Sequence, residues 1–175
     1  MIGLLHMFRA YNDPVQKKSV FLLGLMANTA GWRYADSDAL PPPVDYHEVR
    51  GHLRLDTVSI ADTDLDRRIL AREAVSAEDD VQIRAAVRDA ILEIARHAGG
   101  ATAMQLHYLF WNVFRNICLR GAPQCFRFTD MVRLPRRYHH LLVEREGRSA
   151  CPFVNVCRSA GHARHVEHTF DTDWY

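Results

Sequence analysis

The sequence has no long hydrophobic run, no internal repeat and almost no net charge. Its 175 residues include 22 Lys and Arg and 21 Asp and Glu, which leaves a formal net charge of +1 with His neutral. No apolar stretch approaches the roughly 20 residues of a membrane-spanning helix. The apolar start of the chain is also too short for a secretory leader. We therefore expect a protein without a membrane segment, and the cytoplasm as its location.

Cysteine is scarce as well, with four residues in the chain. In a reducing compartment, four cysteines are more often metal ligands, catalytic thiols or buried thiols than two disulfides. Hydrophobic residues make up 48% of the chain and charged residues 25%, which argues against disorder. The length and composition predict one helical domain over residues 1–175.

The sequence contains no alternation typical of strands, so we expect the all-α class. An Asp at position 45 followed by a Glu at position 48 has the spacing of a capping box, and it predicts that a helix begins there. Residues 56–77 are acidic and give no clear assignment. The other expected helices cover residues 15–29, 78–97 and 102–118, with a possible short one at 138–145.

The spacing of the cysteines suits a metal cluster. Six residues separate Cys118 from Cys125, and five separate Cys151 from Cys157, in an irregular and Pro-punctuated part of the chain. Loops allow four sulfurs to surround one [4Fe-4S] cluster, whose negative charge nearby arginines would offset; the candidates are Arg115, Arg120 and Arg158. A zinc site and separate buried thiols stay open, although zinc ligands usually lie two to four residues apart.

The same part of the chain is basic. Residues 118–164 contain nine arginines against three acidic residues, a net charge of +6, and this predicts a local basic surface. Three histidines follow at three-residue spacing, His162, His165 and His168. No carboxylate or cysteine pattern accompanies them, so we expect an exposed tail there.

The cysteine spacings resemble those of the endonuclease III family of DNA glycosylases, whose cluster ligands follow C-x6-C-x2-C-x5-C. The two outer spacings are kept here, and a basic insertion of 25 residues (126–150) separates the second and third ligands. The segment Val44–Arg50 is similar to the family's V-D-x-H-x-x-R, in which the Asp is the catalytic carboxylate. Lys18 precedes the segment Val44–Arg50 in the chain, as the lysine precedes this motif in family members with lyase activity.

The resemblance implies the C-terminal half of a helix-hairpin-helix glycosylase fold and a [4Fe-4S] cluster in a cluster-binding region at 118–157. It also implies DNA, conceivably RNA, as partner, and an N-glycosylase with possible abasic-site lyase activity. Lys18 would form a Schiff base at C1′ of a flipped nucleotide, and Asp45 would stabilise the positive charge that develops as the base departs. The alternative is a non-catalytic iron–sulfur protein, structural or redox-sensing, in which Asp45 is a helix cap and Lys18 a solvated surface charge.

The chain departs from the family in two places. The glycine-rich hairpin that grips a DNA phosphate is replaced by residues 11–16, which contain no glycine and carry Asp13, an acidic residue that would repel phosphate. Only 17 residues precede Lys18, where the family has most of a helical barrel. Three alternatives follow: a further N-terminal segment completes the substrate pocket, a partner chain completes it, or the chain is a shortened relative that has lost or changed the activity.

Overall fold

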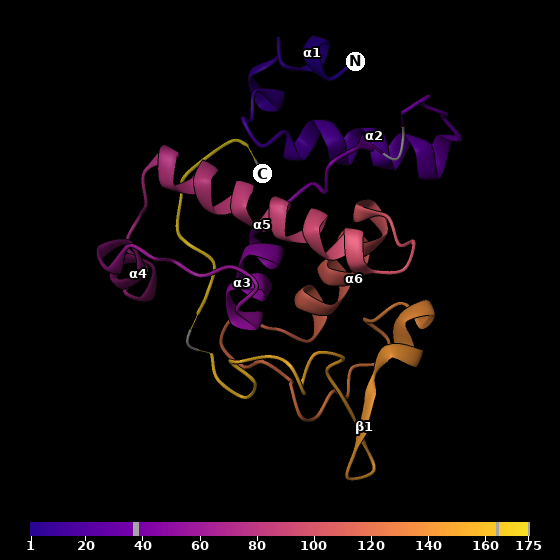
Figure 1. The fold of residues 1–175 in the computed structure, drawn as a ribbon, viewed down its shortest axis with the longest axis vertical. Coiled ribbons are helices and arrows are strands. Elements are labelled where there is room, and N and C mark those ends of the chain that lie inside the picture. The colour runs from indigo at the N-terminus through magenta and orange to yellow at the C-terminus, as the bar shows by residue number, and fades with distance from the viewer. Residues whose placement is uncertain (37–38, 164, 175) are drawn as a thin grey trace. The chain divides into compact units, whose positions relative to one another are not determined.

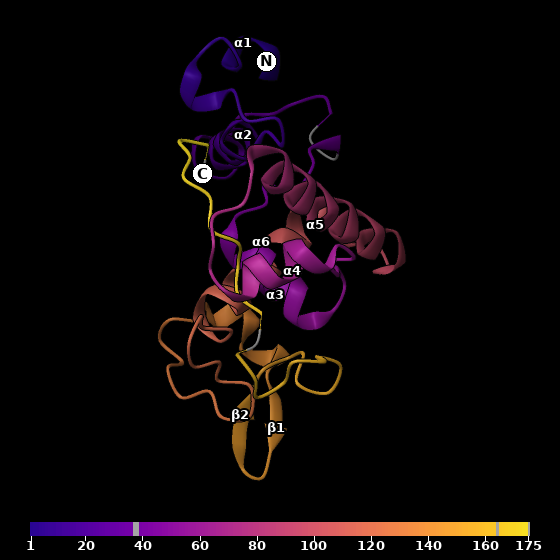
Figure 2. The same cartoon turned by 90° about the vertical axis from the view of Figure 1, so that its left-hand side faces the viewer.

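The computed structural model describes residues 1–36, 39–163 and 165–174. The chain is mostly helical, with one small two-stranded antiparallel sheet (Figures 1 and 2). The mainly helical class is thus confirmed. The structure divides into two compact units, the first made of residues 1–45, 76–107 and 170–175 and the second of residues 46–75 and 108–169.

The first unit is built around two helices, α2 (Lys17–Ala30) and α5 (Ala77–His97), with α1 (Ile2–Leu5) and the 3-10 helix η1 (Arg9–Tyr11) before them. The first residues of α6 (Ala103–Asn116) also belong to it. Helix α5 begins with a capping box, because Ser76 and Asp79 each accept a hydrogen bond from the other's backbone N–H. Its apolar face is buried, as the periodicity of residues 78–97 predicts.

Asp13 has a structural partner in this unit. Both of its carboxylate oxygens accept hydrogen bonds from the Arg84 guanidinium at 2.8 Å, and they also accept the backbone N–H groups of Val15 and Lys17. Asp80 binds the same guanidinium from within α5. Asp13 is only 1% exposed, so this carboxylate fixes the turn before α2 and does not face solvent, where we expected it to repel phosphate.

The second unit holds α3 (Tyr46–Leu55), α4 (Thr63–Leu70), the remainder of α6 and the 3-10 helix η3 (Arg136–Leu141). The strands β1 (Val143–Arg145) and β2 (Arg148–Ala150) form its hairpin. The aromatic rings of Phe110 and Phe114 stack with centroids 5.6 Å apart, and Phe153 contacts both. The buried His52 ring of α3 meets the edges of the same two stacked rings.

Four expected helices are confirmed within a few residues of their bounds, as α2, α3, α5 and α6. The expectation of no strands is wrong, because β1 and β2 have three residues each, too few to display an alternating pattern. The short helix expected at 138–145 is a 3-10 turn that ends at Leu141. In the unassigned segment 56–77, α4 begins at the N-cap Asp62, whose side chain accepts two backbone N–H groups.

The prediction of an exposed tail at 162–168 is also wrong for residues 166–168, which are buried. Val166, Glu167 and His168 are 3%, 4% and 6% exposed. The segment then runs beside the residues before α5, where the Val75 N–H donates to the Thr169 carbonyl at 2.9 Å. In the part of the chain that the structure describes, no helix is both long and apolar enough to cross a membrane.

Candidate metal centre

All four cysteines line one small cavity of about 20 Å³ inside the second unit. Cys118 directly follows α6, Cys125 lies in the next loop, and Cys151 follows β2. Cys118, Cys125 and Cys151 are buried, and Cys157 is half-buried. Apart from Arg54, the remaining wall is apolar or small: Gly51, Leu55, Phe114, Ile117, Phe153 and Val154.

A backbone hydrogen bond closes the insertion at 126–150 and explains why it does not separate the cysteines. The N–H of Cys151 donates to the carbonyl of Cys125 at 2.9 Å, and the N–H of Phe128 donates to Ser149 at 2.7 Å. The chain therefore leaves the cavity at Cys125, turns through the hairpin and returns at Cys151. Cys157 follows one turn later, where its N–H binds the carbonyl of Phe153 at 2.8 Å.

The thiols lie close enough to influence one another electrostatically. Burial is the main cause that raises the pKa of Cys151 to about 12, and the nearby Cys125, Cys118 and Cys157 contribute to this rise because each thiolate would repel the next. Burial also raises the pKa of Cys118 and of Cys157, against the lowering effect of Arg54 on both. Cys118, Cys151 and Cys157 therefore hold their protons at neutral pH, and they are good candidates for a site that exchanges protons for a cation.

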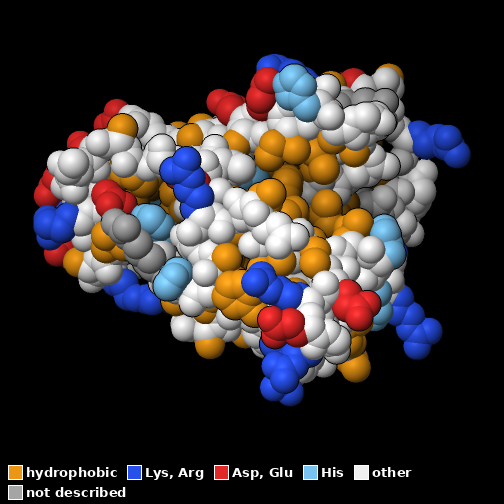
Figure 3. Space-filling model, turned by 60° about the horizontal axis from the view of Figure 1, so that its bottom comes forward, with side chains coloured by type: hydrophobic (Ala, Val, Ile, Leu, Met, Phe, Trp, Pro, Cys, Tyr) orange, Lys and Arg blue, Asp and Glu red, His pale blue; other side chains and the backbone are white. Residues whose placement is uncertain are grey.

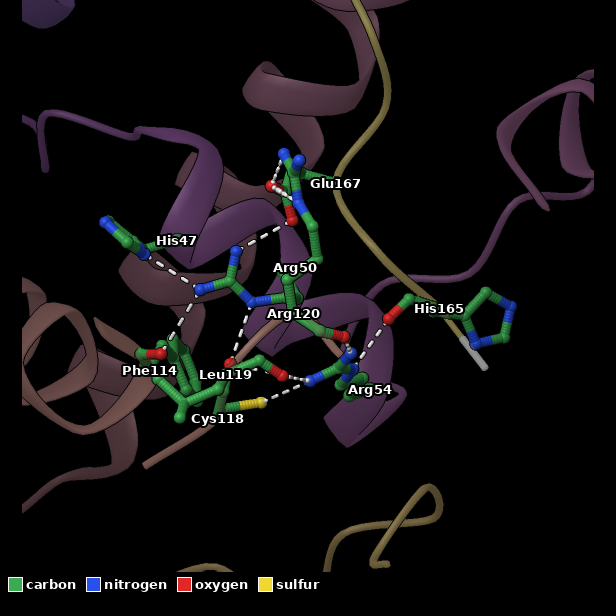
Figure 4. Close-up of polar contacts among 9 residues, drawn as sticks. All are labelled: His47, Arg50, Arg54, Phe114, Cys118, Leu119, Arg120, His165 and Glu167. Atoms are coloured by element: carbon green, nitrogen blue, oxygen red, sulfur yellow. Dashed lines mark hydrogen bonds and ion pairs between the residues drawn. The ribbon is translucent and has the colours of Figure 1, made fainter. Parts of the chain in front are cut away.

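Arg54 is the charged residue of the cavity wall. It is 1% exposed, and its Nη1 donates to the Cys118 sulfur at 3.3 Å (Figure 4). Every nitrogen of the guanidinium is satisfied by backbone carbonyls as well, those of His165, Leu119 and Arg120, at 2.6 to 2.8 Å. On the other side, the Cys157 thiol donates to the carbonyl of Arg54 itself at 3.3 Å. One buried residue of α3 thus contacts two of the four cysteines.

A second arginine, one helical turn earlier in α3, holds the chain that carries Cys118. Arg50 Nε donates to the Cys118 carbonyl at 2.8 Å, and its Nη1 pairs with the buried Glu167 at 2.7 Å (Figure 4). Arg120 binds the other oxygen of Glu167. Burial alone would raise the pKa of Glu167, but the hydrogen bonds and charges of these arginines keep it below its usual range.

The arginines expected to offset a cluster's charge are engaged elsewhere. Arg115 stacks on the Trp111 ring at 4.7 Å, Arg120 pairs with Glu167, and Arg158 pairs with Asp56 at 2.8 Å. Sequence reasoning missed Arg54, although its position four residues after Arg50 places both on one face of α3. That spacing was the available signal.

Lys18 and Asp45, the two candidate catalytic residues, both belong to the first unit. Lys18 is half-buried in α2, and its Nζ donates to the backbone carbonyl of Asp173. The hollow that it lines is shared with Arg9, Ala10, Thr172 and Asp173. Asp45 is 7% exposed and immediately precedes α3. This hollow does not include Asp45, and the catalytic roles of both residues stay predictions.

Gly51 gives a test of how tightly the cavity wall is packed. A Cβ at position 51 would overlap the ring of Phe114, which is only 2% exposed. We expect Gly51→Ala to lower the free energy of unfolding by about 1–3 kcal/mol, measured by urea denaturation, because overpacking forces side chains off their rotamers. Gly121→Ala is the matched control, since nothing lies within 4 Å of its Cβ. Equal stability of the two variants would contradict this packing.

His52 predicts how stability depends on pH. Burial lowers the pKa of His52 from 6.5 to about 3, so the folded protein keeps this ring neutral while the unfolded chain protonates it below pH 6.5. Stability is therefore full above pH 6.5 and falls by about 1.4 kcal/mol per pH unit as the pH drops toward 3. The free energy of unfolding, measured by urea denaturation at several pH values, should depend less steeply on pH in His52→Gln than in wild type. Substitution of the exposed His140 by Gln should leave the wild-type dependence unchanged. A His52→Gln variant with an unchanged slope would refute the assignment.

Across residues 1–36, 39–163 and 165–174, no group of three or more His, Cys, Asp or Glu side chains is placed to hold a metal ion. Comparison of the chain with protein-family models, with curated proteins and with solved structures finds no match. The resemblance to the endonuclease III family therefore stays a prediction from a few motifs.

Proposed function

We propose that this chain is an iron–sulfur protein of DNA base excision, in which Cys118, Cys125, Cys151 and Cys157 hold a [4Fe-4S] cluster. The observation that carries the proposal is that these four residues, spread over 40 positions of the sequence, line one cavity. A cubane cluster takes one thiolate at each of its four irons. Its ligands therefore surround a volume and do not converge on one ion.

The residues around the cavity suit such a group. A cluster with four thiolates is anionic, and the buried Arg54 guanidinium donates to one of the sulfurs. The apolar wall of Phe114, Ile117 and Phe153 would keep water away from the iron–sulfur core. When bound, the cluster would cross-link the irregular segment 118–157 and provide a redox centre. Arg50 and Arg54 would hold the backbone at Cys118 in place for it.

Metal content and visible absorption test this proposal. Protein purified without oxygen should contain about four irons per chain and show a broad sulfur-to-iron absorption in the visible region. Cys118→Ser and Cys151→Ser should each lose most of that absorption. Gly121→Ala should keep it, because this glycine borders no side chain. Zinc in place of iron, or full absorption in both serine variants, would overturn the proposal.

The base-excision part of the proposal is supported by the order of Lys18, Asp45 and the four cysteines, and by the basic segment 118–164. The Lys18 amine would attack C1′ of the damaged nucleotide, the base would depart with its bonding electrons, and loss of a proton from nitrogen and ring opening would leave a Schiff base. Asp45 would stabilise the oxocarbenium charge. The non-catalytic alternative keeps the same cysteines and the same cluster without this chemistry.

Trapping with borohydride distinguishes the catalytic protein from the non-catalytic iron–sulfur protein. Borohydride reduces a Schiff base to a stable amine, so wild type should become covalently attached to DNA that contains an abasic site, while Lys18→Ala should not. Lys17→Ala is the matched control, because its ammonium lies over the Phe21 ring at 5.2 Å and leaves the hollow of Lys18 unchanged. Attachment that survives in Lys18→Ala, or none in wild type, would favour the non-catalytic iron–sulfur protein.

A further inference from the structure

The hairpin of the insertion places two like charges opposite each other. Glu146 and Gly147 form its turn, both with positive φ (53° and 70°), which is the geometry of a type I′ turn. Such a turn fixes the register, and Arg145 is consequently the direct cross-strand partner of Arg148. Like charges directly opposite on a two-stranded sheet destabilise it. The hairpin therefore retains an arrangement that opposes its own folding.

No carboxylate within the described part of the chain relieves this repulsion. Neither Arg145 nor Arg148 forms an ion pair with a described residue, whereas Arg133 in the same insertion pairs with Asp130 at 2.8 Å. Glu144 faces Ser149 across the strands, on the opposite side of the sheet from the two arginines. Both arginines are exposed. Their charges are thus available to a ligand.

An exposed aromatic ring lies under one of them. The Arg145 guanidinium is 5.1 Å from the centroid of the Phe126 ring, which is 45% exposed. Because residues 125–128 run along β2, Arg127 next to this ring adds a third exposed cation to the same hairpin. Figure 2 shows the two strands ending in a turn that projects from the helices of the second unit. Figure 3 shows one face of the molecule, on which exposed hydrophobic side chains lie among protruding Lys and Arg side chains.

We infer that the Arg145–Arg148 pair is a phosphate-binding site for duplex DNA. Two guanidinium groups at neighbouring cross-strand positions can contact successive phosphate oxygens, and an anion between them turns their repulsion into attraction. The net charge of +6 over residues 118–164 favours the same polyanionic ligand. This inference rests on the proposed role in DNA repair and names the element that would engage the backbone. The backbone hydrogen bond from the Cys151 N–H to the Cys125 carbonyl joins this hairpin to the cavity that the cysteines line.

The test measures binding of the holoprotein to a fluorescent duplex by anisotropy over a series of salt concentrations. The double variant Arg145→Gln/Arg148→Gln should bind at least ten-fold more weakly at low salt. Its slope of log K against log salt should be smaller by about 1.8, for two lost phosphate contacts. Arg33→Gln/Arg96→Gln, which removes two exposed arginines of the first unit, is the matched control and should behave as wild type.

Visible absorption of every variant, recorded on the same samples, distinguishes loss of the cluster from loss of DNA binding by the hairpin. Wild-type affinity and slope in the hairpin variant, with DNA binding intact in wild type, would overturn the inference and leave the proposed function standing. No binding by wild type would overturn the inference together with the proposed action on DNA, whereas the absorption would still report the cluster. Equal displacement of the duplex by polyglutamate of matched charge would assign the hairpin to an acidic protein partner and also overturn it.

Discussion

The second unit depends on the burial of one positive charge. A guanidinium without water needs hydrogen-bond acceptors, and every nitrogen of Arg54 has at least one, from four backbone carbonyls and one sulfur. These acceptors come from two separate segments, 118–120 and 165, which have no regular structure of their own. The need to satisfy the arginine therefore fixes irregular chain around α3. The same residue brings a positive charge to the cavity that the cysteines line.

The insertion at 126–150 connects that cavity with the surface. At its base, the hydrogen bond between Cys151 and Cys125 places both thiols on the cavity wall. At its tip, the turn at Glu146 and Gly147 places two arginines opposite each other. A cluster bound at the base would restrain the hairpin that carries the arginines. Loss of the cluster would then remove this restraint from the base of the hairpin.

The sequence predicted the parts of this structure that depend on local patterns. The periodicity of α5 and the predominantly apolar composition of α6 are readable because neighbouring positions carry the signal. The partners of Arg54 could not be read, since they are backbone carbonyls more than 60 positions away, and any residue provides a carbonyl. The strands were missed because three residues show no alternation. Asp13 was assigned to solvent because its partner, Arg84, lies 71 positions away in another helix. The convergence of four cysteines was expected from their spacing, but the hairpin that brings it about was not.

Elemental analysis of the native protein, isolated without oxygen, tests directly whether the four cysteines hold a cluster. We expect iron and acid-labile sulfide in equal amounts, about four of each per chain, in a protein whose cysteines do not react with thiol reagents until the metal is removed. Stoichiometric zinc, or a metal-free folded protein with four reactive thiols, would contradict this expectation.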